Sequence, residues 1–383
     1  MVLKFSINYF IFFAAMATVV PYLQQILKMH NFRAYEIGLL LGIFEITGIF
    51  GPLIIGWVAD RLGKYRIILL ILTIGSAISF MFFRIQISFI TAALVLVFFG
   101  MMYRPIASLT DALASRTLPD LVNQYGRARI WGSIGFVGIS FFYQIWGFLD
   151  TSSPVRIVSV FIVLMGALLL SNLSLPKIKI NRKQKQLPEE REKLLDIIRS
   201  MSLPFWIGIL SAFIVKMGMS GYYSFFSIYL NDIYGIKGIS GIWGIGALAE
   251  IPVVLWGSRY VVRYGVAKML GLAALGTTLR MIIYALAPPV PVMLAAQLLH
   301  ALSFGLLHIT IIVLINQQIK DKSRALAMAI FGGISYGLSG FLGSSISGFI
   351  LESYGFSVMY YFCGIITFGA VVLIFRFRRV FKV

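Results

Sequence analysis

The sequence has one cysteine and few charged residues. A single thiol, Cys363, excludes an internal disulfide and any metal site built from several cysteines. Asp, Glu, Lys and Arg make up 12% of the 383 residues, whereas they make up about 25% of a soluble domain. The chain also lacks a P-loop and an HExxH motif. The missing P-loop excludes transport powered by the chain's own ATP hydrolysis.

Apolar residues are abundant instead. They make up 59% of the chain and give a mean hydropathy of +0.91, against an apolar content of about 45–50% in soluble domains. A water-soluble chain of this length cannot bury so much apolar surface. The composition therefore excludes a soluble enzyme, a disordered protein and a nucleic-acid-binding protein, and it predicts that lipid surrounds most of the chain.

Twelve apolar stretches are long enough to cross a bilayer, whose core of about 30 Å needs roughly 20 helical residues. The first half contains 5–27, 37–59, 67–85, 88–111, 129–149 and 157–176, and the second contains 204–230, 239–258, 268–287, 290–316, 325–350 and 357–375. No small-residue cleavage site follows the first stretch, which predicts a retained helix rather than a signal peptide. The expected fold is an all-α membrane protein with twelve transmembrane helices.

One polar stretch divides these spans into six and six. The division predicts a six-helix bundle over 1–176, a cytoplasmic linker over 177–203 and a second six-helix bundle over 204–383. Leu194, Leu195, Ile197 and Ile198 in the linker favour a short amphipathic helix at the membrane surface. Span 37–59 and its exit loop also weakly resemble a segment about 202 residues later. Duplicated halves joined by a polar hinge are typical of transporters.

The basic residues predict the orientation of the chain in the membrane. Of the 33 Lys and Arg residues, 25 lie in one alternate set of loops together with both termini, and five lie in the other set. The positive-inside rule therefore places both termini and the central linker in the cytoplasm, as expected for a multi-pass protein of a bacterial inner membrane. Spread over many loops, the net charge of +19 does not form a nucleic-acid-binding surface.

The loop after the second span carries a glycine-rich charged motif. Its key residues are Gly56, Asp60, Arg61, Gly63 and Lys64. Gly56 and Gly63 permit a tight loop and close helix approach, and Asp60 can pair with basic residues or a helix N-terminus. The motif resembles the loop 2–3 signature of the major facilitator superfamily, where it implies gating. The alternative is a generic positively charged cytoplasmic loop.

Ionisable residues within the spans are few, and such groups usually face a cavity or each other because lipid disfavours charge. They are Glu45, Arg104, Asp111, Lys216, Glu250, Arg280, His300 and His308, with Arg129 at the mouth of a span. The four cations Arg104, Arg129, Lys216 and Arg280 outnumber the three acids, which favours an anionic or strongly hydrogen-bonding substrate. The alternative for Arg104 and Lys216 is internal pairing, or snorkelling of Arg104. The roles of Glu45 and His308 remain open.

Asp111 and Arg129 should meet at the ends of adjacent helices, where they can form a bidentate pair. Arg104, seven residues before Asp111, should share its helix face. Leu109-Thr-Asp-Ala-Leu-Ala114 and Tyr125-Gly-Arg-Ala-Arg-Ile-Trp-Gly-Ser133 resemble the lactose permease branch of the superfamily and are closest to its phenylpropionate permease group. That resemblance implies that Asp111 and Arg129 bind substrate. A purely conformational ion pair is the alternative.

The second half carries the same resemblance. Gly221–Tyr229, Glu250, Arg280 and the segment around His300 are similar to helices 7 to 10 of that branch, which implies that Glu250, Arg280 and His300 act in proton coupling. Gln297 and Ser303 stand where the lactose permease has Lys and Glu, and Ser303 cannot carry the coupling proton. Tyr222 and Tyr223 could stack on an aromatic substrate. Core packing is the alternative for both rings.

These patterns predict a secondary transporter rather than an enzyme. We expect symport of protons with a small organic acid, with an aromatic acid as one option, by a monomer in the bilayer that needs no cofactor and no metal. The alternatives are a sugar or nucleoside symporter, a drug/proton antiporter, and a non-transporting sensor or lipid scramblase on the same fold.

Overall fold

The structure is a computed structural model that describes residues 1–118, 124–149, 153–177 and 198–381. Its first half contains α1 (Val2–Met29), α2 (Ala34–Leu62), α3 (Tyr65–Met81) with the short turn η1 (Phe82–Arg84), α4 (Phe89–Tyr103), α5 (Pro105–Thr117), α6 (Gly126–Trp146) and α7 (Pro154–Ser174). Its second half contains α9 (Leu203–Tyr234), α10 (Ser240–Tyr264), α11 (Val266–Ala285), α12 (Val290–Ala296), η4 (Gln297–Leu299), η5 (Ala301–Leu306), α13 (Leu307–Gln318), α14 (Asp321–Gly332), η6 (Gly333–Leu338), α15 (Ser339–Phe377) and η7 (Arg378–Phe381).

These elements make up the twelve expected crossings. Ten helical stretches of the described chain are long and apolar enough to cross a membrane, and the last of them, Leu326–Phe381, contains two crossings. It breaks at Gly355, whose φ of 80° and ψ of 177° are not helical. Glycine reaches this conformation without steric strain because it has no Cβ. The remaining crossing is α6, whose first turn carries Arg127 and Arg129.

The structure divides one predicted span, shows a π-helical segment in another, and leaves most of the predicted linker helix outside the described residues. The span predicted over 88–111 divides at Arg104, because Pro105 has no N–H to continue the helix and starts α5. The run through α12, η4, η5 and α13 includes a π-helical segment, Ala301–Leu306. Of the proposed amphipathic helix, Leu194, Leu195 and Ile197 lie outside the described residues. The linker boundaries at 177 and 203 therefore remain predictions.

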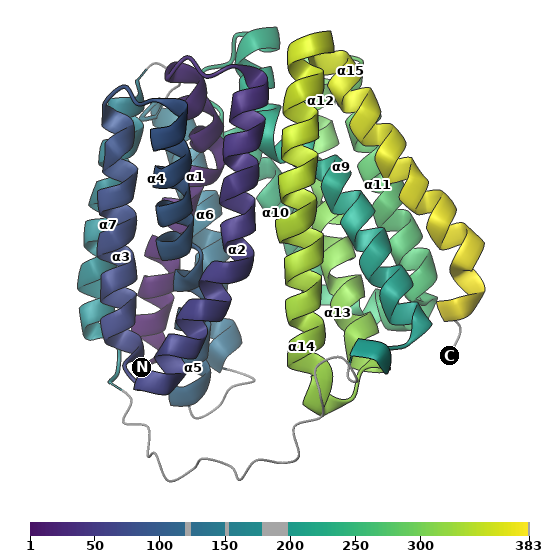
Figure 1. The fold of residues 1–383 in the computed structure, drawn as a ribbon, viewed down its shortest axis with the longest axis horizontal. Helices are drawn as coiled ribbons and strands as arrows, with labels where there is room; N and C mark the ends of the chain where they lie inside the picture. Colours follow the sequence, from purple (N-terminus) through teal and green to yellow (C-terminus); the bar gives the residue numbers. More distant parts are fainter. Residues whose placement is uncertain (119–123, 150–152, 178–197, 382–383) are drawn as a thin grey trace.

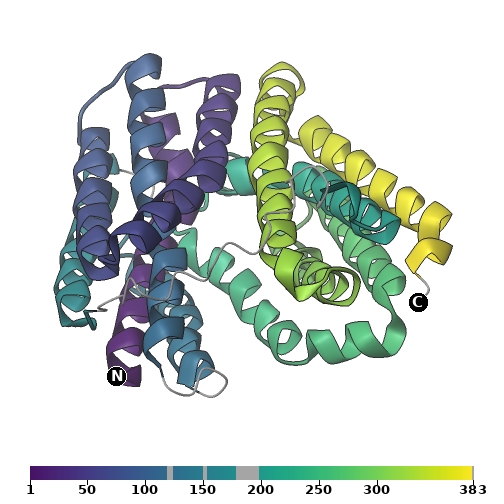
Figure 2. The ribbon, with the colours of Figure 1, turned by 60° about the horizontal axis from the view of Figure 1, so that its bottom comes forward.

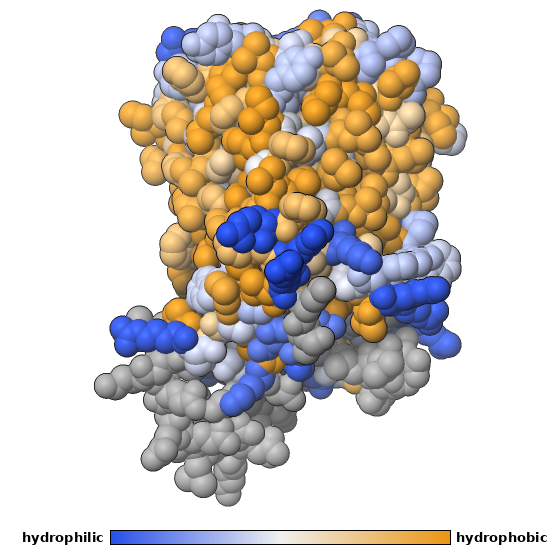
Figure 3. Space-filling view, turned by 90° about the vertical axis from the view of Figure 1, so that its right-hand side faces the viewer, coloured by the Kyte–Doolittle hydropathy of each residue, from blue (hydrophilic) through white to orange (hydrophobic). Residues whose placement is uncertain are grey.

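Two helical bundles lie side by side (Figures 1 and 2). In the first, α1 packs against α6 and α7, and α3 packs against α4 and α7; in the second, α15 packs against α9 and α11. The outward faces are apolar: Ile90, Val163 and Ile365 are each at least 70% exposed. On the face drawn in Figure 3, hydrophobic residues cover the upper part and hydrophilic ones gather toward the end that carries the termini. Such a surface fits a lipid bilayer.

The bundles are joined at the end away from the termini. There Gln25 Nε2 donates to the Ser227 carbonyl at 2.6 Å, and Lys28 forms an ion pair with Asp232. At the same end Cβ atoms have no room between α2 and α15, because one added to Gly38 would lie 2.4 Å from the Ser344 carbonyl oxygen. Glycine thus lets the two bundles close on each other here.

The interior of the first bundle is reached from the opposite end, which carries both termini. The side chains of Glu45, Arg104, Asp111 and Arg129, which belong to membrane spans or their ends, are 23–36% exposed. A pocket of about 310 Å³ at this end is lined by Asp111, Ala112, Ser115 and Tyr125. Closure at one end and access at the other is the arrangement of an alternating-access transporter held in one of its two states.

Candidate functional site

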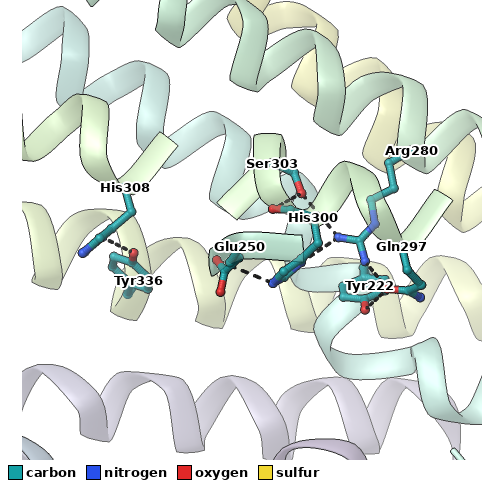
Figure 4. A network of polar contacts seen from close by, with 8 residues as sticks. All are labelled: Tyr222, Glu250, Arg280, Gln297, His300, Ser303, His308 and Tyr336. Carbon is teal, nitrogen blue, oxygen red and sulfur yellow. Dashed lines mark hydrogen bonds and ion pairs between the residues drawn. The ribbon is translucent and has the colours of Figure 1, made fainter. Parts of the chain in front are cut away.

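A buried network around Arg280 forms the centre of the second bundle (Figure 4). Arg280 on α11 is fully buried. Its Nη2 donates to Gln297 Oε1 at 2.7 Å, its Nη1 lies 3.0 Å from His300 Nδ1 and 3.3 Å from Ser303 Oγ, and its Nε donates to the Tyr284 hydroxyl at 3.2 Å. A buried charge needs such partners. The guanidinium group is thus held by neutral acceptors, and Ser303 and Gln297 supply two of them.

His300 connects this network to Glu250 on α10. Because a guanidinium group only donates, His300 Nδ1 must accept from Arg280, which leaves the ring hydrogen on Nε2. Nε2 lies 3.9 Å from Glu250 Oε1, too far for a hydrogen bond, and that oxygen has no hydrogen-bond partner among the described residues. A Cβ at Gly246 would approach the His300 ring within 3.3 Å. Glycine there lets α10 come close to His300. The three residues predicted for proton coupling therefore lie in one cluster.

The aromatic pair Tyr222 and Tyr223 lies against this cluster. Tyr222 is buried and donates to Gln297 Oε1 at 3.0 Å, and the Arg280 guanidinium lies 4.0 Å from the centre of its ring. Tyr223 is half-buried beside the His300 ring, at 6.2 Å between ring centres. Trp243, which the sequence did not single out, lies with its ring centre 5.1 Å from that of Tyr222. Tyr222 orients the polar network, whereas Tyr223 retains an accessible face.

Lys216 lies nearby on α9 and has no hydrogen-bond partner among the described residues. Its side chain is 4% exposed, and its Nζ lies 3.8 Å from the ring centre of Phe304 and 4.4 Å from that of Tyr336. The Tyr336 hydroxyl lies 2.8 Å from His308 Nδ1. Phe304 stacks between His300 and His308, with ring centres 5.5 and 6.1 Å away. The two histidines are therefore separated by an apolar ring and form no direct proton relay in this state.

In the first bundle, Asp111 contacts Tyr9, Arg129 and Tyr125. The Tyr9 hydroxyl donates to Asp111 Oδ1 at 2.6 Å, and Arg129 Nε lies 3.9 Å from the same oxygen. The contact with Arg129 is single, so the bidentate geometry is wrong for this state. Arg129 instead lies over the Phe13 ring at 4.3 Å. Tyr9 gave no signal in the sequence because one tyrosine in an apolar helix resembles a packing residue.

Arg104 pairs with Glu45 rather than with Asp111. Its Nη2 donates to Glu45 Oε1 at 2.7 Å, and its guanidinium lies 4.1 Å from the Phe44 ring centre. A Cβ at Gly48 would lie 2.8 Å from Arg104 Nη1, so glycine makes room for the side chain. The helix break at Pro105 removes the continuous face on which Arg104 and Asp111 were expected together. Internal pairing, one of the two alternatives for Arg104, fits this geometry.

The charged motif was expected in a loop, but Gly56, Asp60 and Arg61 lie in the last turns of α2, where the motif is held within its own bundle. Asp60 accepts from Arg116 Nη2 of α5 at 2.8 Å and from the Tyr65 hydroxyl of α3. Gly63 ends α2 with a φ of 68°, the left-handed conformation that glycine favours. Lys64 is the N-cap residue of α3, and Arg61 lies over the Trp57 ring. A Cβ added to Gly56 would meet no packed neighbour within 4 Å among the described residues, so the close approach expected of Gly56 does not occur in this state.

Replacing Asp60 with Asn should slow transport while leaving substrate affinity within a few-fold. Asp60 links the ends of three helices that must move together, and it lies far from the buried network. Initial uptake rates and equilibrium binding in proteoliposomes would separate the two effects. Asp60→Glu, which keeps the charge, should retain most of the rate. Equal loss of binding and transport in Asp60→Asn would contradict a gating role.

Among the described residues, no group of three or more His, Cys, Asp and Glu side chains is arranged to hold a metal ion. Two bundles joined at one end, with buried titratable groups between their helices, define a secondary transporter. The chain belongs to the MFS_1 like family, which it matches over residues 2–362. The superfamily resemblance read from the sequence motifs is therefore confirmed.

Relatives across this family are named for chemically different substrates. The maltose permease of Geobacillus stearothermophilus is 23% identical over 378 residues, covering 98% of this chain and 94% of the relative. A protein of Escherichia coli (strain K12) named as a 3-phenylpropionic acid transporter is 24% identical over 361 residues, covering 93% and 92%. The crystal structure of the nucleoside transporter NupG superposes with a TM-score of 0.84 at 20% identity, covering 100% and 99%. At 20% identity, the likeness to NupG is one of fold alone.

Proposed function

We propose that the protein is a proton-coupled symporter that carries a small organic acid across the membrane by alternating access. One observation carries the proposal. Within the part of the second bundle that the structure describes, the partly buried carboxyl group of Glu250 has an oxygen with no hydrogen-bond partner, and the buried cation Lys216 has no acceptor. The first can take up a proton, and the second can attract an anion. The relative named for 3-phenylpropionic acid supports a carboxylate substrate.

The proposal includes an orientation of the chain in the membrane. The excess of Lys and Arg in one alternate set of loops and at both termini supports a cytoplasmic location of the termini. The open end would then face the cytoplasm, and the joined end would face outward. In this reading Glu250, Arg280 and His300 handle the proton, while Asp111 and Arg129 at the pocket of the first bundle contribute to substrate binding.

A sugar or nucleoside is the second candidate substrate. Asp111, Tyr9 and Arg129 place a carboxylate, a hydroxyl and a guanidinium group together beside a pocket of about 310 Å³. These groups suit recognition of substrate hydroxyls by hydrogen bonding. The maltose and nucleoside relatives are consistent with it.

A flux screen in proteoliposomes distinguishes these functions. The purified protein would be tested with labelled monocarboxylates, maltose and uridine, with and without an imposed pH gradient. We expect uptake of at least one monocarboxylate that needs an acidic exterior and that makes the exterior more alkaline. Uptake only of maltose or uridine would favour the second candidate. Carboxylate flux that is independent of the pH gradient, or export driven by it, would contradict proton symport.

A further inference from the structure

Lys216 differs from the other interior cations in what surrounds its charge. Arg280 has four neutral partners within hydrogen-bonding distance, Arg104 pairs with Glu45, and Arg129 contacts Asp111. Lys216 is only 4% exposed, and its Nζ has no hydrogen-bond acceptor among the described residues. An ammonium group carries three N–H donors. Three donors are therefore available in the centre of the second bundle.

Two aromatic rings cover this ammonium group, and both belong to π-helical segments. Phe304 lies on η5 (Ala301–Leu306) and Tyr336 lies on η6 (Gly333–Leu338). Ring faces attract a cation, but they do not replace the hydrogen bonds that an ammonium group loses on burial. Single π-helical turns inside α-helices are strained and occur often at functional sites. The rings thus sit on the parts of these two helices that can rearrange most readily.

The acids that act on the Lys216 charge are Glu250 and, more weakly, Glu45. Neither is within ion-pair distance of it, and Glu45 already pairs with Arg104. In this region, Glu250 Oε1 is a carboxylate oxygen that has no hydrogen-bond partner among the described residues. The other titratable or charged groups that face this pair from neighbouring elements are Arg280, His300, His308, Tyr223 and Tyr336. Arg280 is satisfied by its own network, so Glu250 supplies the anion that balances Lys216.

We propose that Lys216, between the rings of Phe304 and Tyr336, is the site that takes the carboxylate of the transported acid, and that this carboxylate replaces Glu250 as the counter-charge of Lys216 when Glu250 is protonated. This inference rests on the proposed function. A proton from water binds a Glu250 oxygen and neutralises it, and the substrate anion then restores one negative charge beside Lys216. Acid and proton therefore bind together because the buried site holds one anion at a time.

The first test compares acids with their amides. Half-saturation concentrations for 3-phenylpropionate and benzoate, and for the two corresponding amides, would be measured in proteoliposomes. Lys216→Gln should weaken the acids by roughly ten- to a hundred-fold, as expected for losing a charge-assisted hydrogen bond, and leave the amides nearly unchanged. Lys216→Arg should restore part of the preference. Lys237→Gln, which removes the same charge from an exposed position after α9, serves as the matched control.

The second test uses pH. Affinity for the acid should weaken in the wild type as pH rises, because ionised Glu250 competes for Lys216. In Glu250→Gln the affinity should become independent of pH, a change that a purely structural role would not produce. An unaltered acid-to-amide preference in Lys216→Gln overturns the Lys216 site while leaving acid symport intact. Failure of the wild type to accumulate either acid under a pH gradient overturns the proposed function itself, and this inference with it.

Discussion

Glu250→Gln is expected to abolish uphill, pH-driven accumulation of the substrate while preserving exchange of labelled for unlabelled substrate. Ser303 cannot take up a proton, and Asp111 is held by Arg129 and the Tyr9 hydroxyl. The Glu250 side chain is 20% exposed, and its Oε1 has no hydrogen-bond partner among the described residues, so this oxygen is available to take up a proton. Exchange requires no net proton movement, so it separates coupling from binding.

Accumulation and exchange would be measured on the same proteoliposomes under an acidic exterior. Glu36→Gln is the matched control, because Gln at the third position of α2 can still complete the capping box there. It should accumulate substrate at the normal rate. Normal accumulation by Glu250→Gln would instead exclude Glu250 as the coupling group and direct attention to His300 or Glu45.

Gly38→Ala is expected to shift the protein strongly toward the state that is open at the end away from the termini. The new Cβ would lie 2.4 Å from the Ser344 carbonyl oxygen and 3.0 Å from Gly348 Cα. These are backbone atoms, which cannot rotate away. Overpacking of this kind costs about 1–3 kcal/mol, which changes the ratio of two states roughly 5- to 150-fold. Relief comes from separating α2 and α15, that is, from opening this end.

Spin labels on the two bundles would measure that opening. Arg84 and Lys237 are exposed near the joined end, and the single native cysteine is buried, so introduced cysteines at these positions can be labelled selectively. The distance between labels should lengthen in Gly38→Ala, and uptake should fall. In Gly369→Ala on α15, the new Cβ would meet no packed neighbour within 4 Å among the described residues, so neither the distance between labels nor uptake should change. An unchanged distance in Gly38→Ala would show that the close approach of α2 and α15 does not hold this end shut.

The clustering of Glu250, Arg280 and His300 was predictable because each lies in a segment that resembles the lactose permease branch, and that resemblance implies a shared role in proton coupling. Several partners within the site were not. Tyr9 contacts Asp111 across 102 positions of sequence, and Glu45 contacts Arg104 across 59. Each pairing depends on how two helices are rotated about their axes, and apolar spans hold little information about rotation. Trp243 was missed for the same reason, since most aromatic residues of such a chain pack against lipid or one another.

The sequence by itself determined the environment, the number of crossings and the family. Those properties follow from runs of apolar residues about as long as a bilayer is thick, and from short motifs whose residues are neighbours in the chain. Only the tertiary structure decided which end is joined and that Gly38 meets the backbone of α15. It also decided that, in the part of the chain that the structure describes, Lys216 is surrounded by aromatic rings and has no acceptor. The physical reason is that hydropathy acts residue by residue, whereas the balance of buried charges depends on distances between helices far apart in the chain.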